Sequence, residues 1–142
     1  MNLKYLLIFS IVLSISNASA VIIFSDNFET GNLNGWNLSN VGGARNWSSS
    51  STNPFEGSFH AQSQPLSTTQ PASVMERTIS TLNYQNINFS YYRRLIGLDA
   101  ADEFQVEWYN GSIWAILEQT GGSSANDAGY FLRTFNLSLA SN

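Results

Sequence analysis

The chain contains no cysteine and only one histidine among its 142 residues. The absence of cysteine excludes a disulfide framework, a thiol nucleophile and cysteine-bound zinc. No G-x-S-x-G motif accompanies the histidine, His60, so the sequence indicates no serine-hydrolase triad. Without disulfides, an apolar core or a bound ion must stabilise the fold, and a hydrophobic content of 43% with nine Phe, six Tyr and four Trp is ample for a core.

Basic residues are also scarce, and the only lysine, Lys4, lies near the N-terminus. It precedes an apolar run, Tyr5–Ile15, and an A-x-A motif that ends at Ala20, a pattern typical of a secretory signal peptide. The run is shorter than the about 20 residues of a membrane-spanning helix, so an uncleaved anchor is the minor alternative. We therefore expect a cleaved signal peptide over residues 1–20 and a secreted, extracellular domain over residues 21–142.

Cleavage after Ala20 would leave five Arg against ten Asp and Glu, a net charge of −5. Nucleic acids and anionic lipids bind surfaces rich in Lys and Arg, because counterion release drives that binding. An acidic chain is a poor partner for either. The charge therefore disfavours both classes of partner.

Alternation of apolar and polar residues predicts strands at Ile87–Arg94 and Glu103–Tyr109, each with one face toward a core and one toward water. Asn110-Gly111 predicts a two-residue type I′ hairpin turn after the second strand. The next strand, Ile113–Leu117, is apolar on both faces, which predicts that both faces are covered, either between two layers or near a sheet edge under a loop.

Further short strands are separated by turns rich in Gly, Pro, Asn and Ser. They are predicted at Val21–Phe28, around Leu38 and Trp47, and at Ser58–Ser63, Ala72–Ser80 and Gly129–Leu137. Many short strands without a helical segment predict an all-β fold, an antiparallel β-sandwich or barrel in one domain.

Four segments resemble extracellular jelly-roll modules. Asn27–Trp36 resembles their opening F-E-x-G-x-x-x-G-W motif, and Phe55–Ser63 resembles an aromatic-x-G-S-x-x-A strand. Arg77–Arg94 resembles a mid-module segment, and Gly97–Glu118 resembles a D-x-F-x-V-x-x-x-x-G-x-x-W-x-x-L hairpin. Such motifs are similar to those of MAM domains and of carbohydrate-binding modules of the concanavalin-like and galactose-binding-like types.

The resemblance implies an antiparallel jelly-roll β-sandwich. In such modules a further strand follows the one that corresponds to Gly129–Leu137, so the sandwich is expected to be one strand short. Either the chain is a fragment or a partner chain completes the sheet. An open sheet edge would also favour self-association.

The resemblance also implies one structural Ca²⁺. Glu29 would be its best side-chain ligand and Asp26 the second, with backbone carbonyls of Gly57 or Ser58. Calcium takes about six to eight oxygen ligands, and the carboxylate expected on the final strand has no match here. The alternative is that Asp26 and Glu29 are ordinary turn residues.

A polar face of the predicted sheet is a candidate sugar-binding surface, because amides and carboxylates bind hydroxyls while aromatic rings stack on sugar rings. Its side chains would include Tyr92, Arg94, Glu103, Gln105, Glu107 and Tyr109, beside Asn88 and Ser90. Trp47, in a Ser-rich loop, is expected to be the most exposed tryptophan and a further ligand contact, although tryptophans are more often core residues. The alternative is an ordinary solvated face.

The first hypothesis is therefore a non-catalytic module that binds carbohydrate or another extracellular surface, and the alternative is a MAM-type interaction domain. A glycosidase is the third. Glu103 and Glu107 flank Gln105, where some concanavalin-like glucanases carry Asp. Residues i and i+4 of a flat strand start about 13 Å apart, whereas retaining glycosidases hold their carboxyls about 5–5.5 Å apart.

N-glycosylation sequons occur at Asn37, Asn46, Asn88, Asn110 and Asn136.

Overall fold

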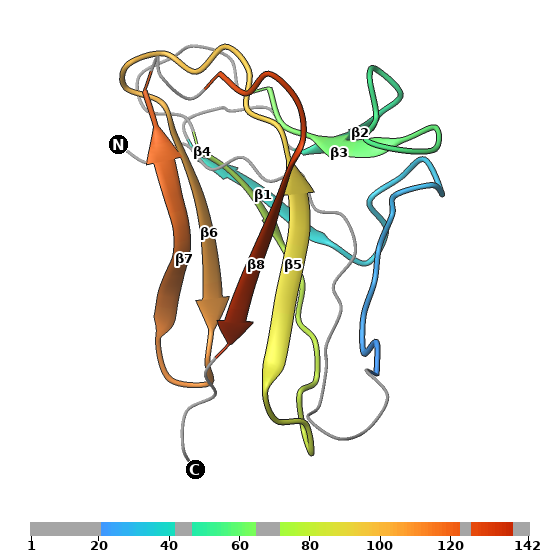
Figure 1. Cartoon of the computed structure of the whole chain (residues 1–142), viewed down its shortest axis with the longest axis vertical. Helices are drawn as coiled ribbons and strands as arrows, with labels where there is room; N and C mark the ends of the chain where they lie inside the picture. The colour runs from blue at the N-terminus through green and yellow to red at the C-terminus, as the bar shows by residue number, and fades with distance from the viewer. Residues whose placement is uncertain (1–20, 42–46, 65–71, 123–125, 138–142) are drawn as a thin grey trace.

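All regular secondary structure in the described part of the chain is β-strand, as the sequence predicts (Figure 1). The computed structural model describes residues 21–41, 47–64, 72–122 and 126–137. These ranges contain no helix long and apolar enough to cross a bilayer. The predicted signal peptide, residues 1–20, and the sequon at Asn46 lie outside them.

The strands form antiparallel two-stranded ladders. In chain order they are β1 (Asn37–Val41), β2 (Ser48–Ser50), β3 (His60–Gln62), β4 (Ala72–Glu76), β5 (Ile87–Arg93), β6 (Glu103–Tyr109), β7 (Trp114–Gly121) and β8 (Phe131–Leu137). The ladders are β1–β4, β2–β3, β5–β8 and β6–β7. The predicted bounds hold for β6 and are longer than the observed ones for β3, β4, β5 and β8.

The strand predicted at Val21–Phe28 is wrong. The Asp26 carboxylate accepts the Phe28 N–H at 2.8 Å, and the Phe28 carbonyl accepts the Gly31 N–H at 2.9 Å. Phe28 itself has a φ of 59°, which is outside the extended region. Local side-chain and turn hydrogen bonds therefore replace the ladder that the apolar sequence suggested.

The β6–β7 hairpin is confirmed, but its turn is not type I′. Tyr109 pairs with Trp114, which leaves the loop Asn110–Ile113 between them. Gly111 alone in this loop has a positive φ, 101°, whereas type I′ needs two such residues. The Asn110 Oδ1 accepts two backbone N–H groups of the loop, both at 3.0 Å, and this contact favours the longer turn.

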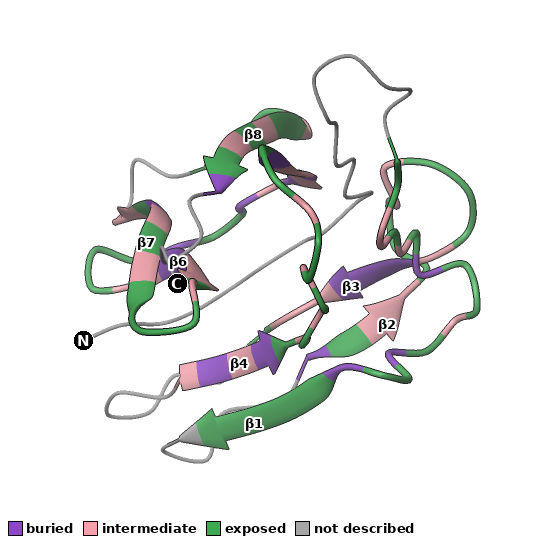
Figure 2. Cartoon of the chain, turned by 90° about the horizontal axis from the view of Figure 1, so that it is seen from below, coloured by how far each residue is buried: buried purple, intermediate pink, exposed green. Residues whose placement is uncertain are grey.

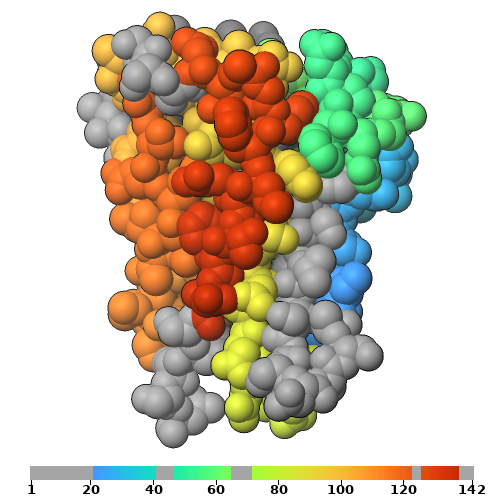
Figure 3. All heavy atoms as spheres, viewed as in Figure 1, coloured from blue at the N-terminus to red at the C-terminus, as the bar shows by residue number. Residues whose placement is uncertain are grey.

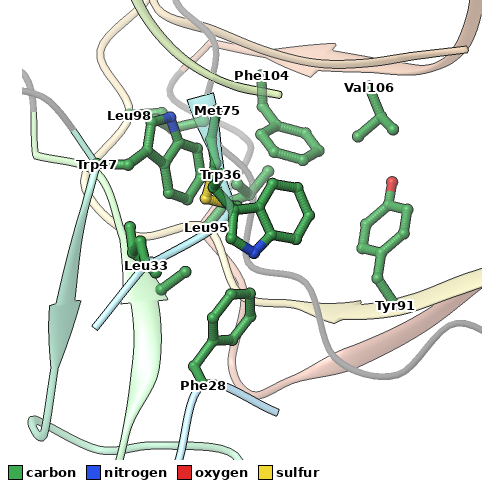
Figure 4. Packing of buried hydrophobic residues seen from close by; sticks show 11 residues of the cluster. Phe28, Leu33, Trp36, Trp47, Met75, Tyr91, Leu95, Leu98, Phe104 and Val106 are labelled. Atoms are coloured by element: carbon green, nitrogen blue, oxygen red, sulfur yellow. The ribbon is translucent and has the colours of Figure 1, made fainter. Parts of the chain in front are cut away.

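The ladders lie in two layers with the core between them (Figure 2). The β1–β4 and β2–β3 ladders are in one layer, and the β5–β8 and β6–β7 ladders are in the other. Figure 4 shows Trp36, Met75 and Phe104 packed in this core. The whole buried cluster is Phe28, Leu33, Trp36, Trp47, Ala61, Met75, Tyr91, Leu95, Leu98, Phe104 and Val106. Burial of each large side chain stabilises the fold by about 1.5–3 kcal/mol.

The prediction that both faces of β7 are covered is wrong. Trp114 is 53% exposed and Ile116 is 54% exposed, and Ile113 in the preceding turn is 63% exposed. Figure 3 shows β7 and β8 on the molecular surface, where Phe131 and Leu132 of β8 are also about half exposed. In the described part of the chain no further layer covers this face. The apolar sequence of β7 therefore gives an exposed apolar surface rather than a second core.

A charged cluster around the buried Glu118 carboxylate joins β7 to β5 and β8. Glu118, which is 5% exposed, accepts a hydrogen bond from the Tyr91 hydroxyl and one at 2.8 Å from the Arg93 Nε. The Arg133 Nε lies 3.0 Å from the same carboxylate, and the Arg93 Nη1 lies 2.5 Å from Asp127. Burial, together with the bond to Glu118, raises the pKa of Tyr91. The phenol therefore stays protonated and donates to the carboxylate.

Candidate functional site

The predicted polar face is not assembled as the sequence suggested. β5 pairs with β8 rather than with β6, so Tyr92 and Arg94 do not continue into a shared ladder with Glu103, Gln105, Glu107 and Tyr109. The Tyr92 ring is stacked on Phe55, with ring centroids 3.9 Å apart. The Tyr109 ring is 46% exposed at the β6–β7 hairpin, where it meets Trp114 at 5.3 Å between centroids.

The expected exposure of Trp47 is wrong. Its side chain is only 3% exposed, and its indole Nε1–H donates to the Ser73 carbonyl at 3.2 Å. A Ser-rich loop flanks it, but the ring enters the core because a large apolar surface gains free energy on burial. Trp47 is therefore a core residue that also reaches the groove described next.

A groove of about 510 Å³ lies between the two layers, and we call it the inter-layer groove. Its volume is in the range of pockets that hold small ligands or peptide side chains, about 300–1,000 Å³. All four tryptophans line it, Trp36 and Trp47 from the β1–β4 side and Trp108 and Trp114 from the β6–β7 hairpin. Three residues predicted as ligand contacts, Trp47, Gln105 and Glu107, are thus brought together here.

The inter-layer groove runs beside the edges of β4 and β6. It is lined by the consecutive residues Ser73–Arg77 and by the consecutive residues Gln105–Trp108. Successive side chains of a strand point to opposite faces, so a cavity that meets every residue lies along the strand edge. β1 covers the other edge of β4 and β7 covers the other edge of β6; among the described residues no strand pairs with the edges on the groove.

Two buried polar side chains that line the groove each have one atom without a hydrogen-bond partner among the described residues. They are the Gln105 Oε1 and the Ser73 Oγ, from residues that are 7% and 0% exposed. A buried polar atom without a partner costs about 1–3 kcal/mol. A molecule in the groove that donates hydrogen bonds would remove that cost, and this is the clearest chemical sign of a binding site in the described part of the chain.

Charged residues border the groove. Glu76 and Glu107 contribute carboxylates, and Arg77 contributes a guanidinium that lies over the Phe24 ring at 4.9 Å from its centroid. Two negative charges against one positive charge give this border a net charge of −1. The acidic balance of the border has the same sign as that of the whole chain, −4.

The predicted calcium ligands lie in turns of the described chain, where both carboxylates accept N–H groups. Asp26 accepts Phe28 N–H and the Trp36 indole N–H, both at 2.8 Å. Glu29 accepts the N–H groups of Ser58 and Phe59 at 2.9 Å.

The position of the Glu29 carboxylate explains why residue 57 is a glycine. Gly57 has a φ of 63°, and a Cβ there would lie 2.5 Å from the Glu29 carboxyl group. The backbone beside Glu29 thus presents Ser58 N–H rather than the carbonyl oxygens that calcium needs. Among the described residues there is no group of three or more His, Cys, Asp or Glu that could hold a metal, and the donors present do not fit calcium well. Calcium binding stays a prediction.

The two carboxylates considered for glycosidase chemistry have different surroundings. Glu107 lines the inter-layer groove, but Glu103 is not among the residues that line it. The Glu103 carboxylate instead accepts a hydrogen bond from the Gln119 side chain on the neighbouring strand. The register with β7 also shifts between Val106 and Glu107, where Leu117 of β7 has no register partner.

The only histidine lies away from the groove, on β3. His60 is 8% exposed and pairs across the β2–β3 ladder with Ser50. Burial lowers the pKa of His60, and a hydrogen bond with the Ser50 backbone opposes this in part. The imidazole is therefore neutral in the folded protein near pH 7.

The groove itself was not predicted from the sequence, because alternation identifies strands but not which edges remain unpaired. The one available signal was Gln105, a long polar residue between the apolar residues Phe104 and Val106. Comparison with protein-family models, with curated proteins and with solved structures finds no match to this chain.

Proposed function

We propose that this chain is a secreted, non-catalytic jelly-roll module that binds an extracellular protein partner through the inter-layer groove. The observation that carries this proposal is the pair of strand edges, those of β4 and β6, that border one tryptophan-lined cavity. Unpaired strand edges present rows of N–H and C=O groups, which favour association with another chain. This function corresponds to the MAM-type interaction domain suggested by the sequence motifs.

Carbohydrate binding is the second candidate. Its support is the gathering of Trp108, Trp114, Gln105 and Glu107 in the same groove, because indole faces and polar side chains suit sugar rings. The outer face first considered for this role is divided between two ladders, and Tyr92 on it is stacked on Phe55. Hydrolysis ranks third, because only one carboxylate of the Glu103 and Glu107 pair lines the groove.

One experiment separates the first two candidates. The full chain, secreted and purified, is panned against a displayed library of random peptides and is applied in parallel to a glycan array. We expect the library to yield peptides that bind the wild type and lose binding to Val74→Glu, which places a charge in the groove. The matched control is Leu38→Glu on β1, which is outside the groove.

Circular dichroism must show that both variants keep their strands before their binding is compared. Glycan binding that Val74→Glu abolishes, together with no enriched peptide, would replace protein recognition by carbohydrate recognition. Peptides that bind Val74→Glu and the wild type equally would place the binding surface elsewhere.

A further inference from the structure

The inter-layer groove is lined by residues from both faces of β4. Both its inward residues, Ser73 and Met75, and its outward residues, Val74 and Glu76, line the cavity. No residue of β1 lines it, so the cavity lies on the side of β4 that β1 leaves open. The free edge of β4 therefore borders the groove, where Ser73 is fully buried and its carbonyl already accepts the Trp47 indole N–H.

On this basis, and resting on the proposed function, we propose that the partner binds as an extended segment that adds a strand to the free edge of β4. The β1–β4 ladder would become a three-stranded sheet, which is the smallest sheet expected to be stable by itself. Main-chain hydrogen bonds to the part of β4 after Ser73 would supply affinity, and alternate side chains of the segment would enter the tryptophan-lined cavity.

The cavity restricts the side chains of this segment. One set of alternate side chains would face Trp36, Trp47 and Met75, so those positions are apolar. The buried Gln105 Oε1 and Ser73 Oγ, which lack partners among the described residues, would accept hydrogen bonds from the backbone or side chains of the segment. The occupied groove would then contain fewer unpaired polar atoms than the open one.

Charge further restricts the partner. Glu76 and Glu107 at the border of the groove outnumber Arg77, so flanking Lys or Arg residues on the segment are favoured. A second copy of the secreted chain, residues 21–142, would carry a net charge of −5 with ten acidic residues, which makes it a poor occupant. The partner is therefore an apolar, extended segment of another protein with basic flanks.

The test uses a synthetic peptide with Lys at both ends and alternating Val and Thr between them, added to the full chain. Two versions carry N-methyl groups on one or the other set of alternate residues. Methylation removes N–H donors from one edge of the peptide and leaves its side chains unchanged. Binding is measured by calorimetry and by the fluorescence of the groove tryptophans.

We expect the parent peptide to bind and at least one methylated peptide to bind at least about tenfold more weakly, because several backbone hydrogen bonds are lost together. If both methylated peptides bind within about twofold of the parent, strand addition is wrong, while binding of the parent still supports a protein-binding groove. Absence of binding by the parent peptide overturns strand addition whatever the display library yields.

A matched pair of variants tests the role of Gln105. Gln105 and Gln119 are register partners on β6 and β7, but Gln105 lines the groove and Gln119 is exposed. We expect Gln105→Leu to weaken peptide binding several-fold. The melting temperature should not fall, since the substitution removes a polar atom that has no partner in the described chain. Gln119→Leu should leave the affinity unchanged. Equal effects of the two variants would exclude Gln105 from the contact.

Discussion

The Phe55 ring lies flat on the Tyr92 ring, with 3.9 Å between ring centroids and 19° between their planes. Tyr130 meets Phe55 edge-on at 5.5 Å, and its hydroxyl donates to the Asn53 carbonyl at 2.8 Å. These contacts join the loop before β3 to β5 and to the residue before β8. Tyr92, which the sequence predicted to contact a ligand, therefore packs against this loop instead.

The first prediction concerns this stack. A double-mutant cycle with Phe55→Leu and Tyr92→Leu should give a coupling free energy of about 0.5–1.5 kcal/mol, the value of stacked aromatic pairs beyond their burial. Urea denaturation of the wild type, both single variants and the double variant measures it. Tyr109 and Trp114, tilted at 46° and exposed, provide the comparison pair and should couple less strongly. Strictly additive effects at Phe55 and Tyr92 would show that the stack adds nothing.

The second prediction concerns the buried carboxylate of Glu118. Glu118→Ala leaves Arg93 and Tyr91 without their shared acceptor in the interior, and removal of one partner of a buried ion pair costs about 3–5 kcal/mol. Chemical denaturation should show that loss. Glu103→Ala, whose carboxylate bonds to exposed Gln119, is the control and should cost less than about 1 kcal/mol. A similar small loss for both variants would contradict a buried network.

The third prediction is a pH dependence that comes from His60. Its pKa is 6.5 when unperturbed, and burial lowers it in the folded state. Between these two pKa values the unfolded chain binds more protons, so the free energy of unfolding falls as the pH drops through about 6.5. His60→Gln should remove that dependence between about pH 7.5 and 5.5, a window above the titration of ordinary carboxylates. An unchanged slope in the variant would assign the effect to other groups.

The fourth prediction tests calcium at Glu29. If the folded state binds Ca²⁺ there, millimolar Ca²⁺ raises the melting temperature of the wild type and not that of Glu29→Gln. The same variant should be less stable even with a chelator present, because the Glu29 carboxylate accepts the Ser58 and Phe59 N–H groups. If the melting temperature of the wild type is the same with and without Ca²⁺, the calcium prediction is wrong. Glu29 then only stabilises the turn.

Local pattern was enough to predict the strands in the second half of the chain. β6 occupies the predicted range Glu103–Tyr109, because alternation over seven residues is a property of the segment itself. The failure at Val21–Phe28 has a specific cause, since the Asp26 side chain provides the hydrogen bond that a neighbouring strand would have provided. Apolar composition there indicated burial correctly for Phe28, which is fully buried, but not the backbone conformation.

Strand pairing and side-chain burial depend on contacts between residues distant in sequence. The predictions that depended on such contacts were wrong. Nothing local distinguishes β8 from β6 as the neighbour of β5, so the proposed polar face joined strands that lie in different ladders. Trp47 looked exposed because serines surround it, whereas Ser73 from another strand accepts its indole N–H. Glu118 and Arg93 are buried together as an ion pair between β7 and β5, which no local pattern indicates.

The β5–β8 ladder has a consequence for the order of folding. Its register joins Ile87 to Leu137, so most of the second half of the chain must be synthesised before this ladder closes. The β6–β7 hairpin lies within that interval and closes through the short loop Asn110–Ile113. Local contacts form faster than distant ones, because they lose less chain entropy on closure. The hairpin is therefore the expected folding nucleus, and closure of β5–β8 over it is the expected slow step.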